Sequence, residues 1–195
     1  MKTLAVSLLT ACCAVFRTGV SQAEVRAQIM PVAQPPTVVE KNPPGDIPDN
    51  QVFVTYRSPL GFSLKVPEGW ARRETLNSVE FADKYNRISV AVTSRGLPLT
   101  LDDVRAHEIR ELQQSGNDVH VSRVRATQLP SGNAFVVTYA SKSARNPVTN
   151  KVIGLDSERY FFWKDGKLAT LTLSAPAGAD NADQWQLMAR SFSWQ

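Results

Sequence analysis

Apolar and polar residues alternate along much of the chain after residue 50, and this period of two indicates β-strands. Short runs of this kind lie at residues 52–56, 62–66, 78–83 and 87–93. Turn-forming residues bound each run, so the pattern predicts a series of short antiparallel strands joined by hairpins.

Two later runs are apolar on both faces, at residues 134–141 and 159–163. A strand of this kind is typically buried on both sides. Asp165 and Gly166 separate the second run from a further strand at residues 168–174, and this dipeptide is the strongest hairpin signal in the chain. The sequence therefore predicts an antiparallel sheet that is covered on both faces.

Residues 100–116 have the spacing of an amphipathic helix. Thr100 followed by Asp103 is a capping-box pattern, and Gly116 ends the helix. A second helix begins with Asp180 as its predicted N-cap. Its apolar face carries Trp185, Met188, Ala189 and Phe192. We therefore predict an α+β domain in which helices flank the antiparallel sheet on both faces, as an α-β-α sandwich.

The first 23 residues have the pattern of a secretory signal peptide. Lys2 precedes an apolar run at residues 4–16, and the tripeptide SQA ends at the predicted cleavage site after Ala23. The predicted location is therefore the periplasm or the extracellular space. The tetrapeptide LTAC offers an alternative, because it resembles a lipobox in which Cys12 would be lipidated and would anchor the protein to the bacterial envelope. Cys12 and Cys13 are the only cysteines, so cleavage after Ala23 would leave a mature chain without thiols.

Residues 24–50 form a predicted proline-rich, disordered linker. Six of the 12 prolines fall in this stretch, which has no sustained apolar period. The folded domain is accordingly predicted to span residues 51–195.

The formal net charge of +4 does not indicate a nucleic-acid partner, because most charges alternate in sign along the chain. The loop predicted at residues 141–157 has more basic than acidic residues and carries Lys142, Arg145 and Lys151. We interpret it as a candidate partner-binding loop for an anionic protein surface or lipid headgroups. The alternative is a hairpin tip whose cations serve only solubility.

Candidate catalytic residues are isolated from one another in the sequence. His107 has no second histidine at the spacing of a zinc helix, and His120 has no acidic residue at ligand spacing. The segment GFSLK around Ser63 begins like a nucleophile elbow, but Lys65 replaces the glycine that the sharp turn of such an elbow requires. We therefore predict a non-enzymatic protein and assign no catalytic, cofactor-binding or metal-binding residue.

The segment GFSLKVPEGW ends in a predicted structural corner. Pro67 would end the strand, Gly69 would permit the turn, and Trp70 would cover the end of the sheet. Together with VEFAD, FVVTY, RYFFW and the final SFSW, this segment resembles the PsbP-like family, which includes PsbP and bacterial envelope proteins of the DcrB type. The resemblance covers most of residues 52–194. It implies an α-β-α sandwich and a binding or assembly role outside the cytoplasm, whereas the photosynthetic role does not carry over.

The functional expectation is thus an exported bacterial envelope protein that binds, or assembles with, another envelope component, with a lipidated N-terminus as its candidate membrane attachment. The alternative is a small-molecule or lipid carrier with a cavity between the sheet and a helix. A hydrolase with an unrecognised site is the third class.

Overall fold

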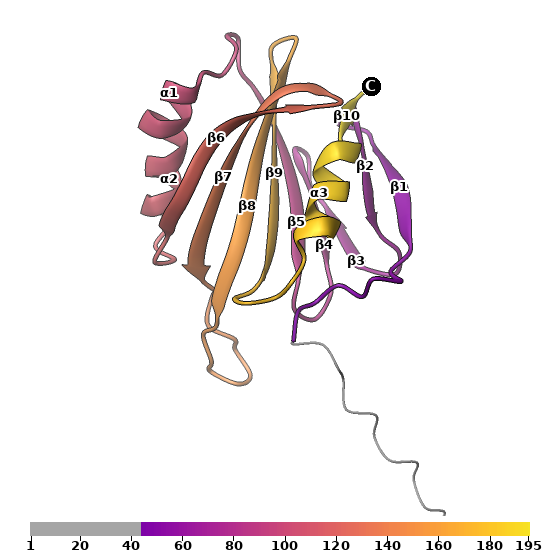
Figure 1. Cartoon of the computed structure of the whole chain (residues 1–195), viewed down its shortest axis with the longest axis vertical. Coiled ribbons are helices and arrows are strands. Elements are labelled where there is room, and N and C mark those ends of the chain that lie inside the picture. The colour runs from indigo at the N-terminus through magenta and orange to yellow at the C-terminus, as the bar shows by residue number, and fades with distance from the viewer. Residues whose placement is uncertain (1–43) are drawn as a thin grey trace, which may run out of the picture. The chain divides into compact units, whose positions relative to one another are not determined.

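The computed structural model describes residues 44–195, which lie within one compact unit (Figure 1). The predicted signal peptide (residues 1–23), the lipidation candidate Cys12 and most of the predicted linker lie outside the described residues. Among residues 44–195, no helix is both long and apolar enough to cross a membrane.

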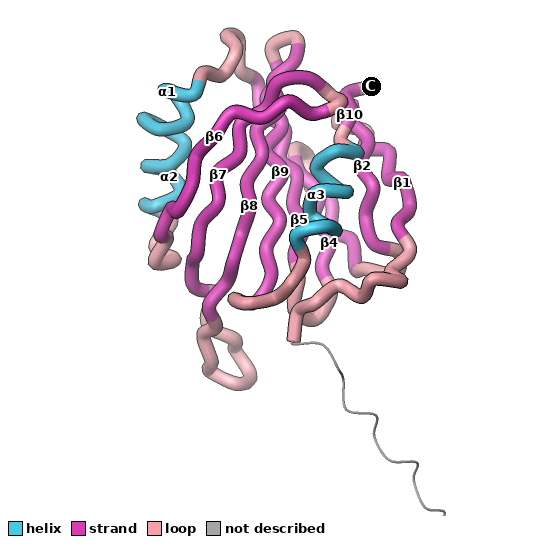
Figure 2. Tube along the Cα trace, viewed as in Figure 1, coloured by secondary structure: helices cyan, strands magenta, loops and turns pink. Residues whose placement is uncertain are grey.

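Strands make up about half of the described chain (Figure 2) and form two antiparallel sheets. The large sheet has seven strands, in the order β3 (Ala71–Glu74), β4 (Ser78–Ala82), β5 (Arg87–Ser94), β9 (Lys167–Pro176), β8 (Gly154–Lys164), β7 (Gly132–Lys142) and β6 (His120–Leu129). The small sheet has three strands, in the order β1 (Phe53–Ser58), β2 (Phe62–Pro67) and β10 (Ser193–Trp194).

Two helical segments complete the described fold. The first runs without a break through α1 (Leu101–Asp103), the π-helical turn η1 (Val104–Glu108) and α2 (Ile109–Gln114). The second is α3 (Ala182–Ser191), which leads directly into β10.

Each face of the large sheet has its own buried cluster. On one face, Phe62 and Leu64 of β2 and Met188 of α3 pack with Phe162 and Leu171 of the large sheet. On the other face, a cluster made with the first helix contains Val104, Leu112, Val137, Phe161 and Leu168. The large sheet is thus covered on both sides, but by different kinds of layer.

The predicted α-β-α sandwich is therefore wrong. The small β-sheet, together with α3, covers the face on which a helical layer was expected. The physical reason lies in β2, whose alternating Phe62, Leu64 and Val66 are all buried. This alternation is the same whether a strand joins the main sheet or a second sheet packed against it.

Several local predictions are confirmed. Thr100 and Asp103 form the capping box, with the Asp103 N–H donating to Thr100 Oγ1 at 3.1 Å and the Thr100 N–H donating to Asp103 Oδ2 at 3.0 Å. Asp165 and Gly166 form the β8–β9 turn with φ values of 48° and 78°. Both residues thus adopt the left-handed conformation that a two-residue hairpin turn requires.

The N-cap of α3 differs by one residue from the prediction, because Asn181 and not Asp180 occupies it. The Asp180 N–H instead donates to Asp46 Oδ1 at 2.9 Å. The last residues of the predicted linker also differ from the expectation, since Ile47 is only 3% exposed and belongs to the core.

Candidate functional site

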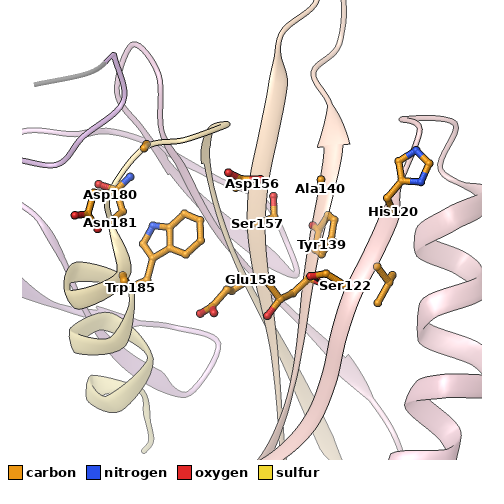
Figure 3. Close-up of a pocket in the computed structure, with 14 residues that line it drawn as sticks. His120, Ser122, Tyr139, Ala140, Asp156, Ser157, Glu158, Asp180, Asn181 and Trp185 are labelled. Carbon is orange, nitrogen blue, oxygen red and sulfur yellow. Dashed lines mark hydrogen bonds between the residues drawn. The ribbon is translucent and has the colours of Figure 1, made fainter.

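A groove of about 480 Å³ lies between the start of α3 and the face of the large sheet formed by β6, β7 and β8 (Figure 3). Its lining residues include Ala140 and Asp156, which are close to the ends of β7 and β8 that the β7–β8 loop joins. The groove combines a sheet floor with a helical wall, so its residues come from segments far apart in the sequence.

The floor of the groove follows from the alternation along β8. Asp156 and Glu158 lie on the same face of this strand, because they are two residues apart. Their cross-strand partners on β7 are Ala140 and Thr138, respectively. Because Ala140 and Thr138 have small side chains, they leave room for a groove above this part of the sheet.

Trp185 forms the wall on α3. Its indole extends from the helix toward the strand that carries Glu158 (Figure 3). The side chain is half-buried and packs against the large core cluster. Trp185 therefore offers part of an aromatic surface to the groove while its remainder is fixed by packing.

Within the part of the chain that the structure describes, the groove is lined by acidic residues and by no basic lysine or arginine. Three carboxylates line it, those of Asp156, Glu158 and Asp180, and no lysine or arginine does. Within residues 44–195, none of the three carboxylates forms an ion pair at 4 Å or less. The groove is thus an acidic surface in a chain whose formal net charge is +4.

Hydrogen bonds hold two of these carboxylates in place. Asp156 Oδ2 accepts a bond of 2.9 Å from the Gly178 N–H, and Glu158 Oε2 accepts one from the Tyr160 hydroxyl. Burial, and secondly this bond to Glu158, raise the pKa of Tyr160 far above its usual range. Tyr160 is therefore a hydrogen-bond donor to Glu158 and keeps the carboxylate oriented.

His120 lies at the edge of the groove, but its ring contacts Asp118, which does not line the groove. Its Nε2 is 3.1 Å from Asp118 Oδ1, and Lys142 Nζ is 2.8 Å from Asp118 Oδ2. The hydrogen bond and charge of Lys142 lower the pKa of Asp118. Within the described residues, no cluster of His, Cys, Asp and Glu has the arrangement of a metal site.

The three carboxylates and the indole that line the groove suit an organic cation, because carboxylates form strong hydrogen bonds with cationic donors and an indole attracts a cation over its face.

The candidate partner-binding loop is shorter than predicted, because β7 extends to Lys142 and β8 begins at Gly154. Lys142 lies on β7 and is paired with Asp118, whereas Arg145 and Lys151 lie in the loop itself and are exposed. The structure thus brings Arg145 and Lys151 together and leaves Lys142 at the base of the loop.

The predicted corner lies at the end of the small sheet. Pro67 is the last residue of β2, Gly69 has a φ of 85°, and Trp70 is half-buried against the core. These three residues also line a second groove, of about 380 Å³, together with Tyr56 and Arg72. Sequence reasoning did not anticipate that groove.

A third cluster, also absent from the sequence predictions, lies beside the first helix. Arg95 Nη2 is 3.2 Å from Asp103 Oδ2, and Arg95 Nη1 is 3.7 Å from Glu108 Oε1. Burial raises the pKa of Glu108, and the neighbouring Glu111 raises it further, although Arg95 acts in the opposite direction. His107, on the same π-helical turn as Glu108, is exposed.

Sequence reasoning also missed Asp156, Glu158 and Trp185 as groove residues. One signal was present, since two acidic residues at alternate positions lead into the apolar run of β8. The indole that faces them comes from a helix that starts 24 residues after Glu158, and no spacing rule joins the two.

No protein-family model and no curated protein matches the sequence. The fold is similar to the solution structure of the cyanobacterial PsbP protein (CyanoP) from Synechocystis sp. PCC 6803, with a TM-score of 0.54 and 16% identity over 77% of this chain and 98% of that chain. The Ran-binding protein Mog1p of Saccharomyces cerevisiae is more distant, with a TM-score of 0.49 and 11% identity over 74% of this chain and 96% of that chain. The first likeness shows that the fold is PsbP-like. The resemblance to DcrB-type proteins stays a prediction.

Proposed function

We propose that this chain is an exported, non-enzymatic envelope protein that binds another envelope component through the groove between α3 and strands β6–β8. The observation that carries the proposal is the half-buried Trp185 facing Glu158 and Asp156, whose carboxylates have no cationic partner within the described residues. The PsbP-like fold is compatible with many functions, so the site and not the fold supports the proposal.

The chemistry of the groove suits a lysine or arginine side chain of a partner protein. The aliphatic part of such a side chain would pack on the indole, and its charged group would reach the carboxylate of Glu158. A cation over an indole contributes about 0.5–1 kcal/mol at an exposed site. A hydrogen bond to a charged group contributes about 1.5–3 kcal/mol. One side chain bound in this way would therefore anchor a contact, while the rest of the interface would come from surrounding residues.

The location of the protein is proposed from the sequence alone. The leader supports export to the periplasm or secretion, and LTAC supports the alternative of a lipid anchor at Cys12. Mass spectrometry of the mature N-terminus distinguishes the two, because cleavage after Ala23 leaves Glu24 first, whereas lipidation leaves an acylated Cys12.

The groove also favours a second candidate function, that of a small-molecule carrier, because it lies between the sheet and a helix. Its three carboxylates do not suit a lipid acyl chain, since apolar contact would remove their water without replacing it. The ligand of such a carrier would be a small organic cation.

Photo-crosslinking in intact cells tests the protein-binding proposal. A photoreactive phenylalanine derivative is placed at Ala182, an exposed residue that lines the groove, and at Ala106, an exposed residue of the first helix, as the matched control. We expect a discrete protein adduct from position 182 only. Glu158→Gln should weaken this adduct, whereas Glu68→Gln, the same change at an exposed position outside the groove, should not.

Two results would argue against the protein partner. One is the absence of an adduct at position 182 that is stronger than that at position 106. The other is an adduct that Glu158→Gln does not change. Binding of a small diamine to the purified protein, lost in Glu158→Gln, would then favour the carrier instead.

A further inference from the structure

The loop that joins β7 to β8, residues 143–153, projects from the end of the large sheet (Figure 1). It contains Arg145 and Lys151 and no acidic residue. This segment is a separate surface from the groove, since none of its residues lines the groove.

Hydrogen bonds within the loop define its conformation. Asn146 Oδ1 accepts from the N–H groups of Val148 and Thr149, each at 2.9 Å. Arg145 Nη1 donates to the carbonyl oxygen of Asn150 at 2.9 Å, and the Asn146 N–H donates to the carbonyl oxygen of Lys151 at 2.9 Å. The loop therefore keeps its shape without burying its own apolar side chains.

Three aliphatic side chains are exposed in this loop. Val148 is 90% exposed, Val152 is 40% exposed and Ile153 is 44% exposed. A single exposed aliphatic residue is ordinary on a protein surface. Three of them within six residues, on a loop with a cation before Val148 and another after it, form an amphipathic tip.

The charged residues of the loop itself are all basic. Lys142, at the base of the loop, is paired with Asp118, and Asp118 also contacts His120. Asp156, the acidic residue that follows the loop on β8, accepts a bond from Gly178 and lines the groove. Arg145 and Lys151 therefore remain as the charges of the loop itself.

We infer that this loop docks on an anionic lipid bilayer, with Val148 in the interfacial region and Arg145 and Lys151 at the lipid phosphates. A basic and apolar surface of this kind binds such interfaces by combining apolar burial with attraction to anionic headgroups. The described chain begins at the same end of the domain as the loop (Figure 1), because Gly45 lies against Pro176 and the adjacent Ala177 N–H donates to the carbonyl oxygen of Gly154 at 3.0 Å. A membrane tether on the preceding chain would thus be attached at the end that carries the loop. The inference goes beyond the proposed groove function and does not depend on it.

Vesicle co-sedimentation tests the inference with residues 24–195, the mature chain that the predicted cleavage after Ala23 leaves and that contains no cysteine to carry a lipid. The probes are vesicles of phosphatidylcholine alone and vesicles with equal parts of phosphatidylglycerol. We expect binding only to the anionic vesicles and a decrease with added salt. The double change Arg145→Glu and Lys151→Glu should weaken binding by at least about tenfold. Lys164→Glu with Lys167→Glu, the same charge change at the opposite end, should have little effect.

A second measurement reports on insertion of the tip. A tryptophan introduced as Val148→Trp should shift its fluorescence to shorter wavelength on anionic vesicles and be quenched by brominated lipids. Leu76→Trp, at a side chain that is 99% exposed between β3 and β4, on the opposite side of the large sheet from β7 and β8, should show neither effect. Glu158→Gln should bind the vesicles like the unmodified protein, which separates this inference from the groove proposal.

The inference is overturned if the anionic vesicles do not bind the protein, or if both double reversals weaken binding equally. Quenching at position 148 that does not exceed that at position 76 would also overturn it. Binding of an anionic protein through the loop, without vesicle binding, would assign the loop to the other class of partner.

Discussion

The side chain of Asn181 accepts a hydrogen bond of 2.7 Å from the backbone N–H of Ile47, a residue 134 positions away in the sequence. The same amide donates to the carbonyl oxygen of Gly45 at 2.9 Å and to Asn86 Oδ1 at 3.2 Å. Asn181 is 2% exposed, so its amide serves three segments within the protein interior. One side chain thereby joins the beginning of the described chain, the β4–β5 turn and the start of α3.

Asn181→Ala should lower the free energy of unfolding by about 2–3 kcal/mol, because it leaves buried polar groups without partners. Urea denaturation followed by circular dichroism measures this change. Asn133→Ala, at an exposed position of β7, is the matched control and should cost less than about 0.5 kcal/mol. Equal effects of the two substitutions would show that the interior amide has no special role.

Gly45→Ala should be destabilising for two reasons. Gly45 has a φ of 104°, and an added Cβ would lie 2.5 Å from Cδ of Pro176, whose ring cannot move aside easily. Gly69→Ala isolates the first reason, because Gly69 has a φ of 85° and nothing lies within 4 Å of its added Cβ. We expect a cost of about 1–2 kcal/mol for Gly69→Ala from backbone strain and a larger cost for Gly45→Ala. Thermal unfolding of both variants checks the order, and a smaller loss at Gly45 would contradict the packing of this segment against Pro176.

Local features were predictable from the sequence because neighbouring residues determine them. The capping box needs only Thr100 and Asp103, and the β8–β9 turn needs only Asp165 and Gly166. The helix on residues 101–114 follows from its periodic pattern together with that cap, although the π-helical turn inside it had no sequence signal.

The arrangement of the layers was not predictable in the same way. Strand β10 has only two residues, and β2 pairs with it across more than 120 residues of sequence. No local pattern reports such a pairing, so the small sheet was missed. The burial of Ile47 was missed for a related reason. Ile47 is an isolated apolar residue in a proline-rich stretch, and the residues that it packs against lie far away in the sequence. The groove residues were missed because they meet only after α3 has packed beside the sheet.

Phe192→Ala should be among the most destabilising single changes. The Phe192 ring stacks on Phe162 of the large sheet at a centroid distance of 4.1 Å and on Phe62 of the small sheet at 5.6 Å. Its removal opens a cavity between the two sheets, and we expect a loss of about 3–5 kcal/mol. Leu187→Ala, at a side chain of α3 that is 38% exposed, should cost much less. Comparable losses in urea denaturation would show that Phe192 does not join the sheets.

The pH dependence of stability should change in Glu108→Gln. Burial raises the pKa of Glu108 in the folded state, so the folded protein binds this proton more tightly than the unfolded chain does. A carboxyl group with a raised folded pKa makes no difference to stability below its unfolded pKa, and it lowers stability as the pH rises from there through the folded pKa. Glutamine does not ionise, so the stability of Glu108→Gln relative to the unmodified protein should increase between pH 3.5 and pH 7. The loss of the Arg95 contact opposes this gain, but the raised pKa of Glu108 shows that the effect of burial is larger than that of the contact.

Urea denaturation of Glu108→Gln and of the unmodified protein at a series of pH values measures the difference in stability, and Glu68→Gln, at an exposed glutamate, serves as the control. A relative stability that falls with rising pH would mean that Arg95 outweighs the burial of this carboxyl group.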